Sequence, residues 1–208
     1  MGNRIASPPR TKSIFHLDKN GLSEEEILFL LEHTKFSREQ ILEFYSNFLR
    51  DCPHGFLTKR QFLRIFKTIF QNEHMCEKSE KFCEYIFRAI DRNSKNFIEF
   101  SDFITYFYIT SFGSQSEKIE LAFKIFDLNK DNVIERSEFR RVFEALLELT
   151  CDQNAKRQNV RQFEQQLDVL IKRLDKNGNR IIEFDEFLNG CLEDDYIADL
   201  LVNKMFNC

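Results

Sequence analysis

The sequence predicts an all-α protein of four helix–loop–helix units in two pairs, with a short two-stranded β contact between the paired loops. Three observations predict it: a pattern repeated four times along the chain, oxygen-bearing side chains at regular positions in one twelve-residue segment, and a low content of turn formers. The 208 residues include only three Pro and six Gly. Few such residues favour long helices over many turns.

The repeat consists of an apolar residue followed five positions later by Phe. The four pairs are Leu57 and Phe62, Ile98 and Phe103, Ile134 and Phe139, and Ile182 and Phe187. Aligned on these pairs, four twelve-residue loops begin at Arg50, Asp91, Asp127 and Asp175. A fixed spacing found four times indicates four copies of one supersecondary unit.

Helices are expected on both sides of each loop. The segments 23–26, 37–40 and 58–61 have the capping-box pattern, a Ser or Thr followed three residues later by Glu or Gln, which marks a helix start. Apolar side chains then recur at helical spacing in Ile27, Leu30 and Leu31, and in Ile41, Phe44, Tyr45 and Phe48. Gly113 is the expected boundary between the two halves.

The third loop, residues 127–138, carries the most informative pattern. Oxygen-bearing side chains stand at positions 1, 3, 5, 9 and 12, which are Asp127, Asn129, Asp131, Glu135 and Glu138. Val133 adds its main-chain carbonyl at position 7, and apolar Ile134 at position 8 is placed to pair with a partner loop. This is the ligand pattern of an EF-hand loop for Ca²⁺, which takes about six to eight oxygens. An acidic surface turn is the alternative, but it does not require this spacing.

The fourth loop has a complete ligand set with one carboxylate fewer. Its members are Asp175, Asn177, Asn179, the Ile181 carbonyl, Glu183 and Glu186. Arg180 stands at position 6, where the loop needs a positive φ and usually has Gly. Arg adopts that conformation at a cost of about 1–2 kcal/mol, whereas Asn132 in the third loop tolerates it. We therefore expect weaker calcium binding than in the third loop, partly recovered by pairing of Ile134 with Ile182.

The first loop, residues 50–61, lacks the acids that a calcium site needs. Arg50 and Gln61 replace them at positions 1 and 12, and Pro53 stiffens the turn. We expect this loop to be an inactive scaffold.

The second loop is a degenerate site. It keeps Asp91 and Asn93, but Lys95 occupies ligand position 5, where it removes a ligand and repels a cation. Asp102 replaces the Glu at position 12, and its shorter carboxylate suits six-coordinate Mg²⁺ better than Ca²⁺. Weak metal binding, or none, is expected here.

Within the inactive first loop, the sequence Cys52-Pro53-x-Gly55 resembles the first loop of the neuronal calcium sensor family. The sequences Ile109-Thr110-Ser111-x-Gly113 and Phe187-Leu188-Asn189-Gly190 also resemble this family, and the resemblance spans about residues 20–201. It implies two EF-hand pairs and calcium-dependent binding of a target protein helix in a hydrophobic groove of the N-terminal half. The second loop departs from the family, where it is usually a good calcium site, so the third and fourth loops are the expected active pair.

The N-terminus is similar to a myristoylation site. Met1-Gly2-Asn3-Arg4-Ile5-Ala6-Ser7 places Gly2 correctly but has Ala6 where Ser or Thr is preferred. One myristoyl chain gives only marginal membrane affinity, and the basic residues of the arm add an electrostatic attraction to anionic lipid. An unmodified, solvated arm is the alternative.

Several classes of function are disfavoured. The net charge of −4 gives no basic excess for nucleic acid, and the four scattered His residues form no recognisable catalytic motif, so neither an enzyme nor a small-molecule substrate is expected. The six Cys residues have no CxxC spacing, which disfavours zinc. Without an apolar run of about 20 residues or a signal-peptide pattern, the expectation is a cytoplasmic protein that associates peripherally with membranes.

The predicted organisation is an N-terminal arm (1–22), an N-terminal EF-hand pair (23–112) and a C-terminal EF-hand pair with a last helix (113–208). The predicted function is that of a calcium sensor that changes conformation and regulates a target protein. Two alternatives stay open: a calcium buffer that binds but barely opens, and a permanently bound EF-hand regulatory subunit of an enzyme or channel.

Overall fold

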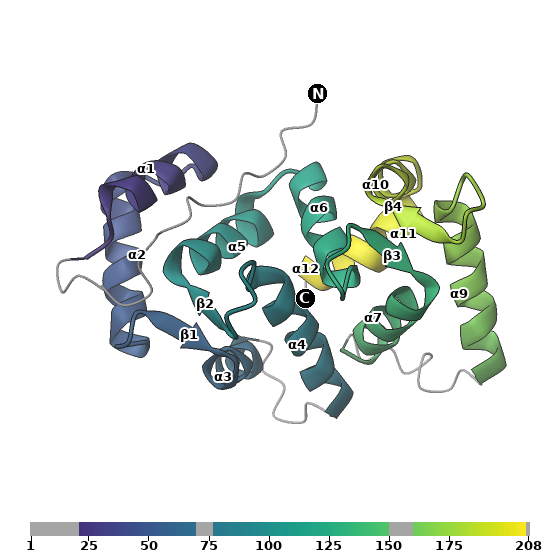
Figure 1. Ribbon diagram of the computed structural model, residues 1–208, viewed down its shortest axis with the longest axis horizontal. Coiled ribbons are helices and arrows are strands. Elements are labelled where there is room, and N and C mark those ends of the chain that lie inside the picture. The colour runs from purple at the N-terminus through teal and green to yellow at the C-terminus, as the bar shows by residue number, and fades with distance from the viewer. Residues whose placement is uncertain (1–20, 70–76, 150–159, 207–208) are drawn as a thin grey trace.

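Four helix–loop–helix units follow one another along the long axis of the molecule (Figure 1). The computed structural model describes residues 21–69, 77–149 and 160–206. The N-terminal units consist of α1 (Glu24–His33), α2 (Arg38–Asp51), β1 (Phe56–Thr58), α3 (Lys59–Ile69), α4 (Glu77–Ile90), β2 (Phe97–Glu99) and α5 (Phe100–Phe112). The C-terminal units consist of α6 (Gln115–Phe126), β3 (Val133–Glu135), α7 (Arg136–Leu149), α9 (Val160–Leu174), β4 (Ile181–Glu183) and α10 (Phe184–Glu193).

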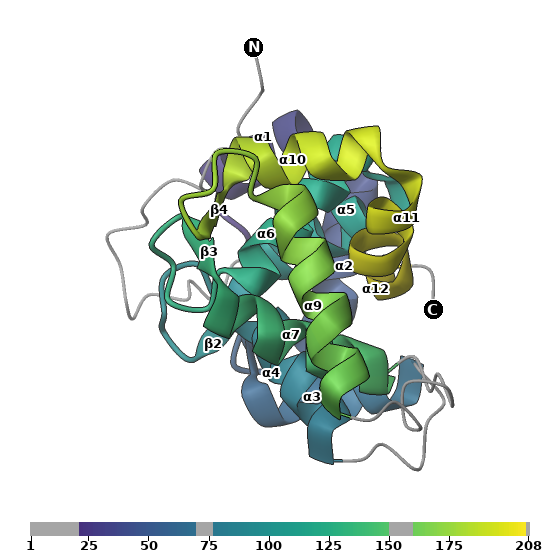
Figure 2. The ribbon, with the colours of Figure 1, turned by 90° about the vertical axis from the view of Figure 1, so that its right-hand side faces the viewer.

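The C-terminus adds a short helical tail to the second pair. It runs through α11 (Asp195–Ala198), the π-helical segment η1 (Asp199–Asn203) and α12 (Lys204–Phe206). The tail is apolar toward the protein: Ile197, Leu201 and Met205 are buried. It packs against α10 and α6, on the other side of α6 from the loops (Figure 2).

Helix starts lie where the sequence predicts them. Ser23 and Glu26 cap α1 reciprocally, and Ser37 and Gln40 do the same for α2. In the third predicted box, the Thr58 N–H and hydroxyl both donate to the Gln61 side-chain oxygen, at 3.0 and 2.6 Å. These bonds satisfy N–H groups that have no partner within the first turn of a helix.

Each pair of units is joined by a two-stranded antiparallel sheet. Strand β1 pairs with β2, with Leu57 opposite Ile98, and β3 pairs with β4, with Ile134 opposite Ile182. All four side chains are almost completely buried. The predicted β contact is therefore confirmed, and the residues at loop position 8 form its centre.

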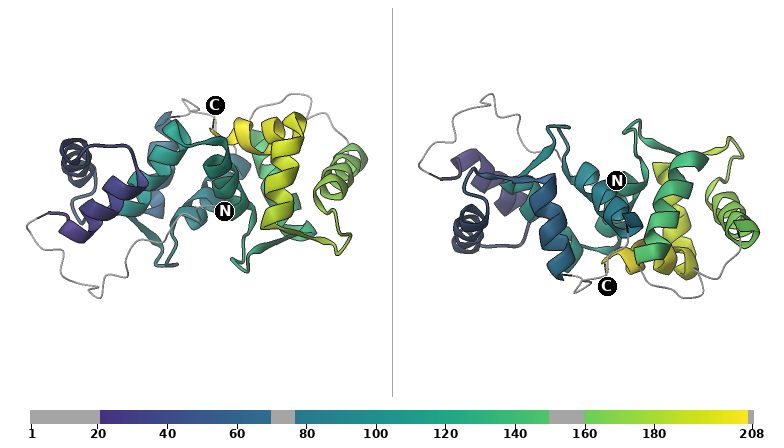
Figure 3. Two further views of the ribbon diagram at one scale, coloured as in Figure 1. Left: turned by 90° about the horizontal axis from the view of Figure 1, so that it is seen from above. Right: turned by 90° about the horizontal axis from the view of Figure 1, so that it is seen from below.

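The two halves share one continuous core. Helix α4 of the N-terminal pair packs against α7 and α6 of the C-terminal pair. Figure 3 shows this arrangement from above and below, with α1 and α2 at one end and α9 at the other. A rigid packing surface between the halves places the second and third loops close together.

Gly113 lies at the short connection between α5 and α6. Its N–H donates to the Ile109 carbonyl at 3.0 Å. A Cβ added at this position would lie 2.4 Å from that carbonyl oxygen, so only Gly allows the approach. Helix α5 ends and α6 begins on either side of Gly113, while the boundary between the two halves at Gly113 and the division of the chain at residues 22 and 112 stay predictions.

Candidate metal centre

The position-12 carboxylate of loop three is buried and fully engaged by the main chain. Glu138 is 4% exposed. Its Oε1 accepts hydrogen bonds from the N–H groups of Leu128 and Asn129, both at 3.0 Å, and its Oε2 accepts one from Glu135 at 2.9 Å. The side chain therefore bridges the beginning and the end of the loop.

The other side chains of loop three are fixed in the same way. Asp127 accepts from the N–H groups of Asp131 and Asn132 at 3.2 and 3.0 Å. Asn129 Oδ1 accepts from the Asp131 N–H at 2.9 Å, and Asp131 Oδ1 from the Val133 N–H at 3.1 Å. These bonds set the side-chain rotamers, and each oxygen keeps a further lone pair for a cation.

Loop four repeats the bonds of the position-12 residue. Glu186 Oε1 accepts from the N–H groups of Lys176 and Asn177 at 3.1 and 3.2 Å, and Oε2 accepts from Glu183 at 3.0 Å. The partners stand at the same loop positions as those of Glu138. Glu186 is only partly buried, so loop four is the more solvated of the two.

The remaining ligand candidates of loop four also match. Asp175 Oδ2 accepts from the Arg180 N–H at 3.0 Å. Asn177 Oδ1 accepts from Asn179, and Asn179 Oδ1 from Ile181, at 2.8 and 3.0 Å. Arg180 has φ of +69°, so it adopts the left-handed conformation that the sequence analysis identifies as costly for this residue type.

Burial disfavours negative charge within loop three. Asp127 is 7% exposed as a whole residue. Desolvation by burial raises its pKa, against the hydrogen bonds from the Asn132, Lys130 and Asp131 main chain, which lower it. A bound cation would compensate this desolvation directly.

Loop two has the backbone conformation of loop three. Asp91 is buried and accepts from the N–H groups of Lys95 and Asn96 at 2.9 and 2.8 Å. Ser94 and Asn96, at positions 4 and 6, have φ of +52° and +63°. Lys130 and Asn132 of loop three have +64° and +70° at the same positions. The substitutions in loop two have therefore changed its charges and left its turn intact.

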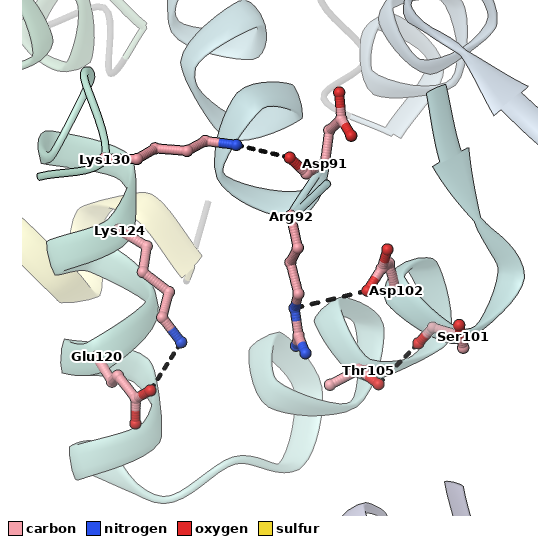
Figure 4. Close-up of polar contacts among 8 residues, drawn as sticks. All are labelled: Asp91, Arg92, Ser101, Asp102, Thr105, Glu120, Lys124 and Lys130. Atoms are coloured by element: carbon pink, nitrogen blue, oxygen red, sulfur yellow. Dashed lines mark hydrogen bonds and ion pairs between the residues drawn. The ribbon is translucent and has the colours of Figure 1, made fainter. Parts of the chain in front are cut away.

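The acids of loop two are paired with cations of the chain itself. Lys95 Nζ lies 2.9 Å from Glu99 Oε1, and Arg92 Nε lies 3.5 Å from Asp102 Oδ1. Asp102 lines a small cavity of about 20 Å³ between α4, α5 and α6, and its side chain lies beside Arg92 (Figure 4). Its Oδ1 has no hydrogen bond, because the Arg92 contact lacks hydrogen-bond geometry. Desolvation raises the pKa of Asp102 to about 6, although Arg92 lowers it.

The first loop uses its position-12 residue for another purpose. Gln61 caps helix α3 through its bonds with Thr58, and Arg50 at position 1 is exposed. Gly55 has φ of +78°, so the turn survives although the acidic ligands are missing. This geometry agrees with the predicted scaffold.

Comparison with known proteins identifies the EF-hand pairs and the family of this chain. Two family models, each described as an EF-hand domain pair, match residues 55–110 and 116–192. Neuronal calcium sensor 1 from Lymnaea stagnalis is 31% identical over 180 residues, covering 86% of this chain and 92% of the relative. The chain belongs to the neuronal calcium sensor family.

Two further relatives are similar over most of their length. Recoverin from Homo sapiens is 26% identical over 186 residues, covering 88% of this chain and 91% of the relative. Guanylyl cyclase inhibitory protein from Lithobates pipiens is 28% identical over 162 residues, covering 78% and 77%. Membership of the neuronal calcium sensor family makes the chain an EF-hand calcium-sensor protein, and it confirms the resemblance predicted from Cys52-Pro53-x-Gly55.

Family membership leaves the ligands of this chain to be tested. Within the described ranges, His, Cys, Asp and Glu side chains do not gather in threes at metal-binding separations. In loop three the carboxylates are instead held apart by their bonds to the main chain, with Asn129 and the Val133 carbonyl as the remaining oxygen donors. Asn93 of loop two is exposed, and Gly2 lies outside the described residues.

A partly exposed aromatic cluster lies where α2 and the connection between α1 and α2 meet α5. The ring of Phe36 lies 5.1 Å from that of Phe44, 6.4 Å from Phe107 and 5.9 Å from Phe112. Phe107 is 39% and Phe112 60% exposed. We refer to Phe36, Phe44, Phe107 and Phe112 as the aromatic cluster.

The first two units contain eleven Phe and Tyr side chains that could line a groove, although for each single one a place in the core is the simpler expectation. Phe107 is exposed, and Phe70 lies outside the described residues. The other nine are buried or half-buried: Phe44, Tyr45, Phe48, Phe62, Phe66, Phe82, Phe87, Phe103 and Tyr106. Phe36 and Phe112 are missed by that selection, because they stand outside the regular helical stripes.

Among the described residues, helices long and apolar enough to span a bilayer are absent.

Proposed function

We propose that the chain senses calcium through loops three and four and, in response, regulates a target protein. The observation that carries this proposal is the shared bonding pattern of these loops, in which the position-12 Glu accepts from the N–H groups of positions 2, 3 and 9 in each. The proposed ligands are Asp127, Asn129, Asp131, Val133, Glu135 and Glu138 in loop three, and Asp175, Asn177, Asn179, Ile181, Glu183 and Glu186 in loop four.

The donor chemistry of both loops fits a hard cation. All proposed ligands are carboxylate, amide or main-chain oxygens, which Ca²⁺ prefers. When bound, Ca²⁺ would supply two positive charges that offset the repulsion among the carboxylates. The chain contributes the preset side-chain rotamers and the β3–β4 pairing, which ties the two loops together.

The two loops are ranked by their charge and backbone strain. Loop three has one more carboxylate, and loop four places Arg180 at φ of +69°. We propose that loop three binds Ca²⁺ more tightly, and that loop two, with Asp91, Asn93 and Asp102, binds Mg²⁺ or Ca²⁺ weakly or not at all.

Titration calorimetry tests this ranking. Glu138→Gln should remove most of the calcium affinity, because an amide replaces one carboxylate oxygen of a two-oxygen clamp. Glu186→Gln makes the same change in the weaker loop four and should therefore remove less. Glu25→Gln in the exposed first turn of α1 is the control for loss of one charge. Equal affinities in wild type, Glu138→Gln and Glu186→Gln would contradict the proposed sites.

The aromatic cluster is the proposed contact for a helix of the target protein. Leu28, Leu31 and Leu42 of the first unit are further exposed apolar side chains of the N-terminal half. Apolar groups gathered on a surface favour an amphipathic helix as partner. Calcium-dependent fluorescence of a dye that binds apolar surface, compared between wild type and Phe112→Ala, measures the response.

The same measurements separate the other candidate functions. A buffer would bind calcium in the calorimeter and leave the dye signal unchanged. A permanently bound regulatory subunit would copurify with one large partner in equal amounts, with or without calcium. The role proposed here is regulatory rather than catalytic, with no nucleic acid and no small-molecule substrate.

We further propose membrane association through a myristoylated Gly2. It rests on the N-terminal pattern and on three basic residues of the arm, Arg4, Arg10 and Lys12. Such a protein would be cytoplasmic and would bind membranes peripherally. Mass spectrometry of wild type and Gly2→Ala, coexpressed with a myristoyltransferase, reports the acylation, and sedimentation with anionic vesicles reports the binding.

A further inference from the structure

Two basic side chains connect loop two with loop three. Lys130, at position 4 of loop three, donates from Nζ to the Asp91 carbonyl at 2.6 Å and lies 3.3 Å from Ser94 Oγ (Figure 4). In the opposite direction, Arg88 at the end of α4 donates to the Leu128 carbonyl. Each loop thus offers a main-chain carbonyl near its start to a cation of the other half.

These contacts are made by the residues that organise each loop. Leu128 gives its N–H to Glu138, the position-12 residue, while its carbonyl is held by Arg88. Asp91 receives Lys130 on its carbonyl and two N–H groups of its own loop on its carboxylate. The bonding networks of loops two and three are therefore continuous with each other.

Three positively charged side chains of the protein contact loop two. Lys95 pairs with Glu99, Arg92 lies beside Asp102, and Lys130 contacts the start of the loop. Of these three cations, Lys130 is the one that belongs to the C-terminal half. Its direction depends on the left-handed backbone of loop three, where its φ is +64°.

We propose that Lys130 and Arg88 form a latch that transmits the order of loop three to loop two. This inference rests on the proposed calcium binding at loop three. Without a cation, the carboxylates of loop three repel one another and the loop backbone loosens, so Lys130 loses its fixed position. With loop three filled, Lys130 holds Asp91, and the N-terminal half responds although loop two binds no ion.

Amide hydrogen exchange of Lys95 and Asn96 measures the latch, since their N–H groups bond to Asp91. In the wild-type chain, saturating calcium should slow their exchange about fivefold or more, the size of a typical coupling between sites. Lys130→Met keeps the side-chain stem, removes the ammonium and should abolish this slowing, while the amides of loop three stay protected.

Lys124→Met is the matched control. Lys124 comes from the helix before loop three and carries the same charge, but its Nζ pairs with Glu120 in its own helix at 2.7 Å. It should keep the wild-type response. Glu138→Gln should lose the response together with calcium binding at loop three.

The outcomes distinguish the two proposals. Wild-type protein that gives no calorimetric heat with calcium overturns the proposed function and the latch together. Calcium heat with equal slowing in wild type and Lys130→Met overturns the latch alone. Slowing that persists in Glu138→Gln also overturns it, because loop two would then bind an ion by itself.

Discussion

At the scale of single residues, Asp102 combines burial with an incomplete set of partners. It is 5% exposed, and its Oδ1 lacks a hydrogen bond. Burial raises the pKa of this carboxyl to about 6, from an ordinary value of 3.8, despite the nearby guanidinium of Arg92. A calcium clamp at this position would need an ionised carboxylate, and the raised pKa and the neighbouring Arg92 both work against calcium binding there.

The first prediction is a stability profile with pH. Because the pKa of Asp102 is higher in the folded than in the unfolded state, its contribution favours folding below about pH 4 and is lost as the pH rises toward 6. The loss amounts to about 1–3 kcal/mol. Urea unfolding with a chelator, from pH 4 to 7, measures it in wild type and Asp102→Asn. The difference between the two curves should grow with pH, and parallel curves would contradict the pKa shift.

The second prediction concerns recovery of a calcium site in loop two. Ser94 and Asn96 already have the positive φ angles that loop three shows at positions 4 and 6. Lys95→Asp combined with Asp102→Glu should therefore add one calcium per molecule in titration calorimetry. Lys95→Asp alone is the control, which restores a ligand without the clamp. If the double variant binds no additional calcium, the contacts of Lys130 or Arg92 prevent binding at loop two, and the ligand types do not.

At the scale of elements, local sequence pattern predicts most of what is seen. Capping boxes start α1, α2 and α3 because they satisfy N–H groups of the first helical turn. These starts can be predicted because both partners of each box lie within four residues of sequence. The strand register follows from the position-8 residues, since Ile134 opposite Ile182 is the arrangement that buries both. The left-handed residues Ser94 and Lys130 escape prediction, because nothing in their residue type favours a positive φ.

The third prediction tests the coupling of loops three and four through their sheet. Ile134 is fully buried and pairs with Ile182. Ile134→Ala should cost about 2–5 kcal/mol of unfolding free energy and weaken calcium binding at both loops. Urea unfolding with a chelator and titration calorimetry measure the two effects. Val133→Ala, at a half-buried position of the same strand, should have a small effect, and a loss of affinity confined to loop three would contradict the coupling.

At the scale of the whole molecule, the sequence indicates two halves but not how they meet. The contacts of Lys130 with Asp91 and of Arg88 with Leu128 join residues about 40 positions apart, and helical periodicity carries no information at that range. Exposure is equally hard to predict. Phe112 and Phe82 are the same residue type on helices, yet Phe112 is 60% exposed and Phe82 fully buried. The packing of the helices against one another, and not the residue type, decides which aromatic side chains lie inside.

The last prediction is that the two halves unfold as one unit. Helix α4 supplies core residues against α6 and α7, so melting either half would expose apolar surface of the other. The chain has no Trp, and single Trp substitutions at half-buried Phe36 and Phe163 therefore report on each half separately. Both variants should show the same urea midpoint, and calcium should raise both midpoints together. The expected gain in unfolding free energy is about 2.7 kcal/mol when the calcium concentration is a hundred times the dissociation constant. A calcium shift confined to Phe163→Trp would mean that the C-terminal pair responds without the N-terminal pair.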